Sequence, residues 1–308
     1  MQRKAIELAK KTLVVSMPSN WVKRNNVQKG DALEITENEE SLIINIKQKE
    51  TAKRVVLETK KLGYYDPLYI AYLYQAGVDE VRINFSSPQE LSRITQKLPD
   101  LMGFEIINQG EGFVEIKNIS APMEDEFEII LRRTFHIIQD YASSSLDAAK
   151  NNDFKRIENL LPIENSIDKL TDFCKRVLNK KGYSNPSKTQ FAYTIIRDLE
   201  KIGDFYTEIN EYLLEQKKPL SEETIKVYTQ ANNYFTLFHD LFYKFSSEKA
   251  TEFLKLKQIL LKDAHNLRED LFVAFNLSAL IRMIANLYGP YFLTREDIFD
   301  EEIIQKEI

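Results

Sequence analysis

Two stretches of the sequence place carboxylates four residues apart. The first holds Glu164, Asp168 and Asp172, and the second holds Glu200 and Asp204. On an α-helix, side chains at this spacing lie one above the other on the same face, with Cβ atoms about 5–6 Å apart. If the two helices are neighbours, all five carboxylates converge on one seam. Such a seam is either solvated or neutralised by a cation.

The energetic cost of the seam depends on its burial. Exposed like-charge pairs at this spacing cost only about 0.2–0.5 kcal/mol each. Buried carboxylates without partners either take up protons or bind a metal. We call each row of carboxylates at four-residue spacing a ladder. Apolar residues such as Ile167, Leu199 and Ile202 flank both ladders and indicate partial burial. Spacing alone leaves three alternatives: a solvated acidic stripe, a metal site, and a bundle without any ion, in which Glu200→Gln would raise stability.

Gly203 lies between the two carboxylates of the second ladder. A glycine inside a helix costs roughly 1 kcal/mol relative to alanine. Its presence predicts that another helix, or the ligand shell of an ion, approaches the backbone closely at this point.

The string LEKIGD, Leu199–Asp204, is followed by Ile209 and preceded by the E-x-x-x-D pattern of Glu164 and Asp168. These motifs resemble those of the PhoU family, in its archaeal type. The resemblance implies a bundle of two three-helix repeats that regulates phosphate uptake or phosphate signalling through protein contacts. It also implies a phosphate ABC transporter ATPase or a phosphate-signalling protein as the partner, and a metal on the carboxylates. Carboxylates suit Mg, Ca or Mn and also bind iron or Zn, so the ion stays open.

The composition is that of an ordinary globular protein, with 308 residues, 43% apolar and 29% charged, and a net charge of −5. This charge disfavours nucleic-acid binding by the whole chain, although a local basic patch is compatible with it. The single cysteine, Cys174, excludes a disulfide framework within one chain and fits a reducing, cytoplasmic setting. We expect neither a signal peptide nor direct membrane insertion, because the most apolar stretch, 271–287, is interrupted by Asn276, Arg282 and Asn286.

Residues 1–50 predict a small β domain. A strand ends at Pro18, a short helix covers 19–24 with Ser19 as its N-cap, and a hairpin joins 32–36 to 42–46. The strings VSMPSNWV and KGDALEI resemble the swapped-hairpin domain of the AbrB and SpoVT family, whose members dimerise by exchanging strands and in many cases bind DNA.

The basic residues of this domain are the candidates for DNA binding. Through residue 24 there is one acidic residue, Glu7, against six basic ones, which are Arg3, Lys4, Lys10, Lys11, Lys23 and Arg24. Neutralisation of phosphates is the usual source of such affinity. The hairpin itself is acidic, so two alternatives stay open: DNA binding, and dimerisation or partner docking alone.

Residues 51–120 alternate between strand and helix patterns. The predicted order is βαβαββ, with Pro67 and Pro88 at the starts of the helices and a final hairpin, which is close to a ferredoxin-like sandwich. We interpret this module as a spacer or dimerisation element, because no convergent polar set indicates a ligand, and an effector site is the alternative.

Residues 121–308 predict about six helices by their 3.6-residue periodicity. Pro162 either kinks or restarts the second helix, and the sequence does not decide which. When the last helix is aligned with the helix that carries the LEKIGD string, Arg282 aligns with Glu200 and Asn286 aligns with Asp204. A cation site is therefore expected in the first repeat at most.

Residues typical of an enzyme are missing from the sequence. His136, His239 and His265 lack the Glu-x-x-His spacing of di-iron sites, and no H-E-x-x-H, P-loop or G-x-S-x-G motif occurs. The sequence thus predicts a multidomain α+β regulator, a homodimer or higher oligomer without enzymatic activity. The alternative is a DNA-binding transcription factor whose helical half senses an effector.

Overall fold

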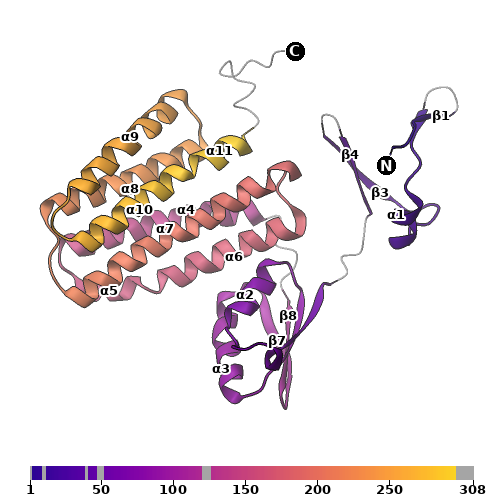
Figure 1. Ribbon diagram of the computed structural model, residues 1–308, viewed down its shortest axis with the longest axis horizontal. Coiled ribbons are helices and arrows are strands. Elements are labelled where there is room, and N and C mark those ends of the chain that lie inside the picture. The colour runs from indigo at the N-terminus through magenta and orange to yellow at the C-terminus, as the bar shows by residue number, and fades with distance from the viewer. Residues whose placement is uncertain (1, 9–11, 39–40, 47–51, 120–125, 296–308) are drawn as a thin grey trace. The chain divides into compact units, whose positions relative to one another are not determined.

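The structure is a computed structural model and describes residues 2–8, 12–38, 41–46, 52–119 and 126–295. The chain forms two compact units, Met1–Ala52 and Lys53–Ile308. The second unit contains both the small sheet and the helices of the bundle (Figure 1).

The first unit consists of two hairpins and one short helix. β1 (Ile6–Leu8) pairs with β2 (Thr12–Val14), α1 covers Ser19–Arg24, and β3 (Leu33–Asn38) pairs with β4 (Ser41–Ile46). The sequence had not indicated β1. The N-cap of α1 is Pro18 rather than the predicted Ser19, because Ser19 is already the first residue of the helix. No side chain caps this helix by a hydrogen bond. Gly30 has a φ of 98°, which explains the glycine in the turn before β3.

A four-stranded mixed sheet follows in the second unit. Its elements are β5 (Arg54–Glu58), η1 (Thr59–Lys61), α2 (Leu68–Gln75), β6 (Glu80–Asn84), α3 (Pro88–Lys97), η2 (Leu98–Asp100), β7 (Phe104–Gly110) and β8 (Phe113–Asn118). The strand order is β5-β6-β8-β7, with β5 and β6 parallel and the other pairs antiparallel. Alternate residues of β6 and β8 are buried, and α2 and α3 lie on one side of the sheet (Figure 1).

The observed element order is the predicted βαβαββ. A ferredoxin-like sandwich has the order βαββαβ, so the likeness of this module to that fold is limited to its two layers. The module has its own apolar core, which includes Ile70, Tyr74, Ile83 and Val114.

The remaining helices form the bundle. They are α4 (Phe127–Lys150), α5 (Phe154–Leu160), α6 (Ile163–Lys181), η4 (Pro186–Lys188), α7 (Thr189–Gln216), α8 (Glu222–Tyr243), α9 (Ser247–Asn266), α10 (Leu271–Asn286) and α11 (Tyr288–Thr294). Pro162 restarts a helix, because α5 ends at Leu160 and α6 begins directly after the proline. In the predicted division into two three-helix repeats, the first consists mainly of α4, α6 and α7 and the second of α8, α9 and α10.

One core runs through both repeats and is rich in aromatic rings. Phe238 is fully buried and contacts Phe135, Phe242, Phe253 and Tyr291, with ring centroids 5.6–6.2 Å apart. Cys174 is buried in the same core, in agreement with the packing role predicted for it.

The stretch Leu271–Thr294 is long and apolar enough to cross a membrane by length and composition. A core helix of a globular protein can pass the same test, so the prediction of no direct membrane insertion stays a prediction. Half of the window is buried inside the protein, and Val273, Leu277 and Ile281 are fully covered by the core of the bundle. Core packing therefore accounts for the buried face of α10, whereas Leu271, Phe272 and Phe275 of the same helix are exposed.

Candidate functional site: carboxylates between two helices

Helices α6 and α7 pack directly against each other, and Gly203 allows the approach. A Cβ atom added at Gly203 would lie 3.0 Å from Cδ1 and 3.2 Å from Cγ2 of Ile167 on α6. Nearly all real Cβ contacts are wider than this. The glycine therefore serves the close packing of two helices, which was one of its two predicted roles.

The carboxylates of the two ladders face this seam. The pKa of Asp168 is raised to about 7, mainly by burial and in addition by the charges of Glu200, Asp172, Asp204 and Glu164. Burial also raises the pKa of Glu164, and the charge of Asp204 raises it in addition. The carboxylates of the two helices thus influence one another electrostatically, and each has a different environment.

A lysine of α6 neutralises the inner end of the seam. Lys175 Nζ donates to Asp172 Oδ1 at 3.2 Å and forms a shorter contact with Glu200 Oε2 of α7. The side chains of Lys175 and Asp172 are only 6% and 9% exposed. Burial raises the pKa of Asp172 despite this partner. The ion pair therefore joins the two helices in a largely dry environment.

Asp204 lies at the more exposed end of the seam. Its Oδ2 accepts from Lys201 Nζ at 2.6 Å, three residues earlier on the same helix. This bond raises the pKa of Lys201, whose side chain is half exposed. Asp204 is thus paired on its own helix rather than across the seam.

The small sheet module contributes to the seam through the end of α2. Gln75 Nε2 donates to Asp172 Oδ1 at 2.8 Å. Next to it, the buried Arg176 donates to the carbonyls of Tyr74 at 2.9 Å and Val78 at 2.6 Å and pairs with Asp79. The carboxylates therefore lie where the module meets the first repeat.

Sequence reasoning missed Lys175, Gln75, Thr171 and Arg176. Each of these residues contacts a carboxylate of the seam or the module beside it. Thr171 does so through its Oγ1, which donates to Glu200 Oε2 at 3.4 Å. The signal for Lys175 was its position three residues after Asp172, which puts both on one helix face. Nothing local signalled Gln75 and Arg176, because their partners lie about a hundred residues away.

The five carboxylates do not fit a metal as they are arranged. Within residues 126–295 and the other described parts, no group of three or more His, Cys, Asp or Glu side chains is placed to hold a metal ion. Two of the five carboxylates bind Lys175 and a third binds Lys201. The metal site stays a prediction of the sequence, and the described conformation offers a lysine in its place.

The predicted DNA-binding residues belong to the first unit. Arg3, Lys4, Lys23 and Arg24 are exposed, whereas Lys10 and Lys11 lie outside the described residues. Exposure is compatible with phosphate contacts but equally with a solvated surface, so DNA binding stays a prediction.

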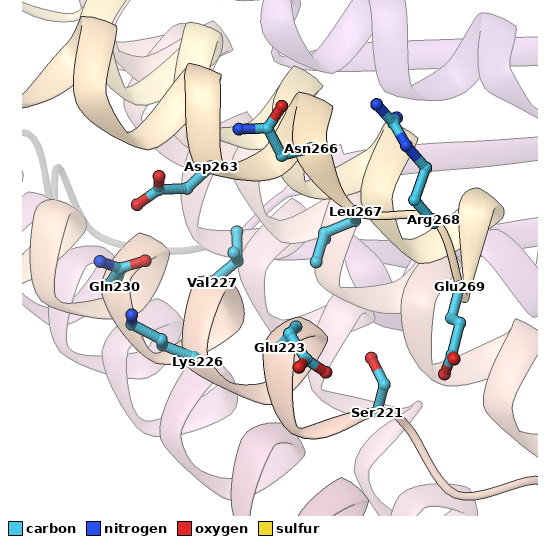
Figure 2. A pocket seen from close by; sticks show the side chains of 10 residues that line it. All are labelled: Ser221, Glu223, Lys226, Val227, Gln230, Asp263, Asn266, Leu267, Arg268 and Glu269. Carbon is cyan, nitrogen blue, oxygen red and sulfur yellow. The ribbon is translucent and has the colours of Figure 1, made fainter.

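A separate pocket lies between the start of α8 and the end of α9, with a cavity of about 370 Å³ (Figure 2). Its lining mixes acidic Glu223, Asp263 and Glu269 with basic Lys226 and Arg268. Arg268 points away from the hollow in this view and donates to the carbonyl of His265 at 3.1 Å. The mixture of charges does not define a ligand class.

The chain is similar to one solved structure, the phosphate transport system regulatory protein PhoU from Streptococcus pneumoniae. The TM-score is 0.46 and 17% of residues are identical, over 58% of this chain and 95% of that one. No family model matches the chain. No curated protein sequence matches it either.

Proposed function

We propose that the protein regulates phosphate uptake or phosphate signalling by contact with other proteins in the cytoplasm. One observation supports this most: the LEKIGD helix and the E-x-x-x-D helix, which carry the sequence resemblance to the PhoU family, pack side by side as α6 and α7. Their carboxylates face one seam, and the motif glycine lies at the closest approach.

The partner in this proposal is a phosphate ABC transporter ATPase or a phosphate-signalling protein. Deletion of the gene in its host is expected to alter phosphate uptake in phosphate-rich medium, and the full-length chain is expected to restore it. The tagged chain, at native expression level, is expected to co-purify with the transporter ATPase. Unchanged uptake and no such association would overturn the proposal.

The alternative of a DNA-binding regulator has its own measurement. Binding to duplex DNA would weaken steeply with salt, and less steeply after Lys23 and Arg24 are changed to alanine. Tight, salt-dependent binding to a defined promoter, with no effect on uptake, would replace our proposal by this one.

We also propose that the first unit forms a dimer with a second copy of the chain. Among its described residues none is buried, and large apolar side chains such as Leu13, Val15 and Leu42 are 60–72% exposed. A unit of this size without a core needs a partner surface to be stable. Light scattering after size-exclusion chromatography should give a dimer or larger assembly. A monomer at micromolar concentration would contradict this proposal and leave the phosphate role untouched.

A further inference from the structure

Lys175 is an unusual lysine because almost all of its side chain is buried. Only 6% of the side chain is exposed, on a helix whose other lysines are more accessible. Lysine is almost never fully buried unless it is paired. The residues around it therefore have to compensate the charge.

The compensation comes from two helices. Nζ of Lys175 contacts one oxygen of Asp172 on its own helix and one of Glu200 on α7. Burial by itself would lower the pKa of Lys175, but Glu200 and Asp172 raise it above its ordinary value. The side chain is thus an ammonium ion at neutral pH.

Neutral donors contact the same two carboxylate oxygens. Gln75 donates to Oδ1 of Asp172 at 2.8 Å, and Thr171 donates to Oε2 of Glu200 at 3.4 Å. The ammonium and a neutral donor therefore share one oxygen of each carboxylate. The arrangement is built from three elements, α2, α6 and α7, around one positive charge.

We propose that the Lys175 ammonium is the resident cation of the α6–α7 seam and takes the position that the carboxylate spacing predicts for a metal. A divalent cation and an ammonium ion repel each other strongly at contact distance in a buried site. A metal would also have to displace a hydrogen-bonded ion pair to reach the oxygens of Asp172 and Glu200. The seam therefore excludes divalent cations while Lys175 is present.

Removal of the ammonium should open the seam to a metal. Lys175→Met keeps an unbranched apolar stem but deletes the charge, which leaves Asp172 and Glu200 without their ion-pair partner. Buried carboxylates in that situation take up protons or bind an ion. This inference does not depend on the proposed role in phosphate regulation.

The test compares three full-length proteins: wild type, Lys175→Met and, as the matched control, Lys201→Met. Lys201 also pairs with a carboxylate of the seam, but its side chain is 49% exposed. Each protein is purified without chelator, titrated with MnCl2 by calorimetry, and analysed for bound metals. We expect wild type and Lys201→Met to hold no stoichiometric metal, and Lys175→Met to bind Mn²⁺ at least about tenfold more tightly than wild type.

Two results would overturn the proposal. One is stoichiometric metal in wild type that Glu200→Gln removes. The other is folded Lys175→Met that binds no more Mn²⁺ than wild type. If Lys175→Met folds only when an ion is added, rescue by Mn²⁺ supports the proposal, and failure of Mn²⁺, Mg²⁺ and Ca²⁺ to rescue it contradicts it. None of these outcomes depends on phosphate uptake, so the proposed function is tested independently by the uptake and co-purification experiments.

Discussion

The two three-helix repeats are held together by different interactions. In the first, polar bonds cross the interior: Asn210 donates to Ser145 at 2.8 Å, and the Tyr141 and Thr207 hydroxyls are 3.0 Å apart. In the second, rings fill much of the interior: Tyr234 stacks on Phe253 with centroids 4.4 Å apart, and its hydroxyl donates to a backbone carbonyl rather than to another side chain. The Lys175 ion pair with Asp172 and Glu200 lies in the first repeat.

The difference shows which repeat holds buried charged side chains in addition to apolar packing. Arg282 and Asn286, which align with Glu200 and Asp204, are both exposed on α10. The second repeat therefore has no buried charge at the equivalent position and contributes mainly stability. The first repeat carries the charged groups and also contacts the small sheet module.

The largest effect that this comparison predicts is on Phe238 of the second repeat. Phe238→Ala removes a fully buried ring from the aromatic core and should lower the free energy of unfolding by about 3–5 kcal/mol. Urea denaturation followed by circular dichroism measures it. Phe275→Ala is the control, because that ring is 70% exposed and its loss should change stability by less than about 0.5 kcal/mol. Equal effects of the two substitutions would show that the core of the second repeat is not where the structure has it.

Glu200→Gln tests the first repeat. It leaves Lys175 with Asp172 as its only anionic partner and should lower the free energy of unfolding by about 1–3 kcal/mol. The exposed Glu208→Gln on the same helix should be nearly neutral. A gain in stability for Glu200→Gln would favour the alternative of unrelieved repulsion between carboxylates.

Much of this architecture could be predicted from the sequence, because helix and strand periodicities are local. The strands of the small sheet and the short helix at 19–24 follow from spacing, whereas the contact between the two carboxylate helices was only a condition of the prediction. Gly203 even indicated the close approach of a second helix, which Ile167 makes.

The identity of the cation could not be predicted in the same way. On a helix with several lysines and carboxylates, Lys175 has the sequence context of a solvated residue. Its burial depends on α2, which brings Gln75 to Asp172 from 97 residues away, and on α7. Such contacts between distant segments leave no periodic signal.

Asp168 makes the stability of the first repeat depend on pH. Its pKa is raised to about 7 by burial and by the neighbouring carboxylates, so the folded state holds its proton up to a higher pH than the unfolded chain does. Its contribution to stability is therefore largest below the ordinary pKa near 4 and is lost as pH rises to about 7. Asp168→Asn should be more stable than wild type at pH 8 by about 1–2 kcal/mol, reduced for solvent screening. Urea midpoints at pH 5 and pH 8 measure this, and an equal gain at both pH values would contradict it.

Substitution of Arg282 should have the smallest effect on the free energy of unfolding, and it tests whether the second repeat contains an ionic interaction of its own. It aligns with Glu200, but its guanidinium is exposed and its nearest polar partner is His265 Nε2 at 3.3 Å. Arg282→Ala should therefore change the free energy of unfolding by less than about 0.5 kcal/mol. The same measurement on Lys175→Ala should show a loss of about 3–5 kcal/mol, because a buried ion pair is then broken. If Arg282→Ala cost as much as Lys175→Ala, the second repeat would contain an ionic interaction of its own, and the charged seam would no longer distinguish the two repeats.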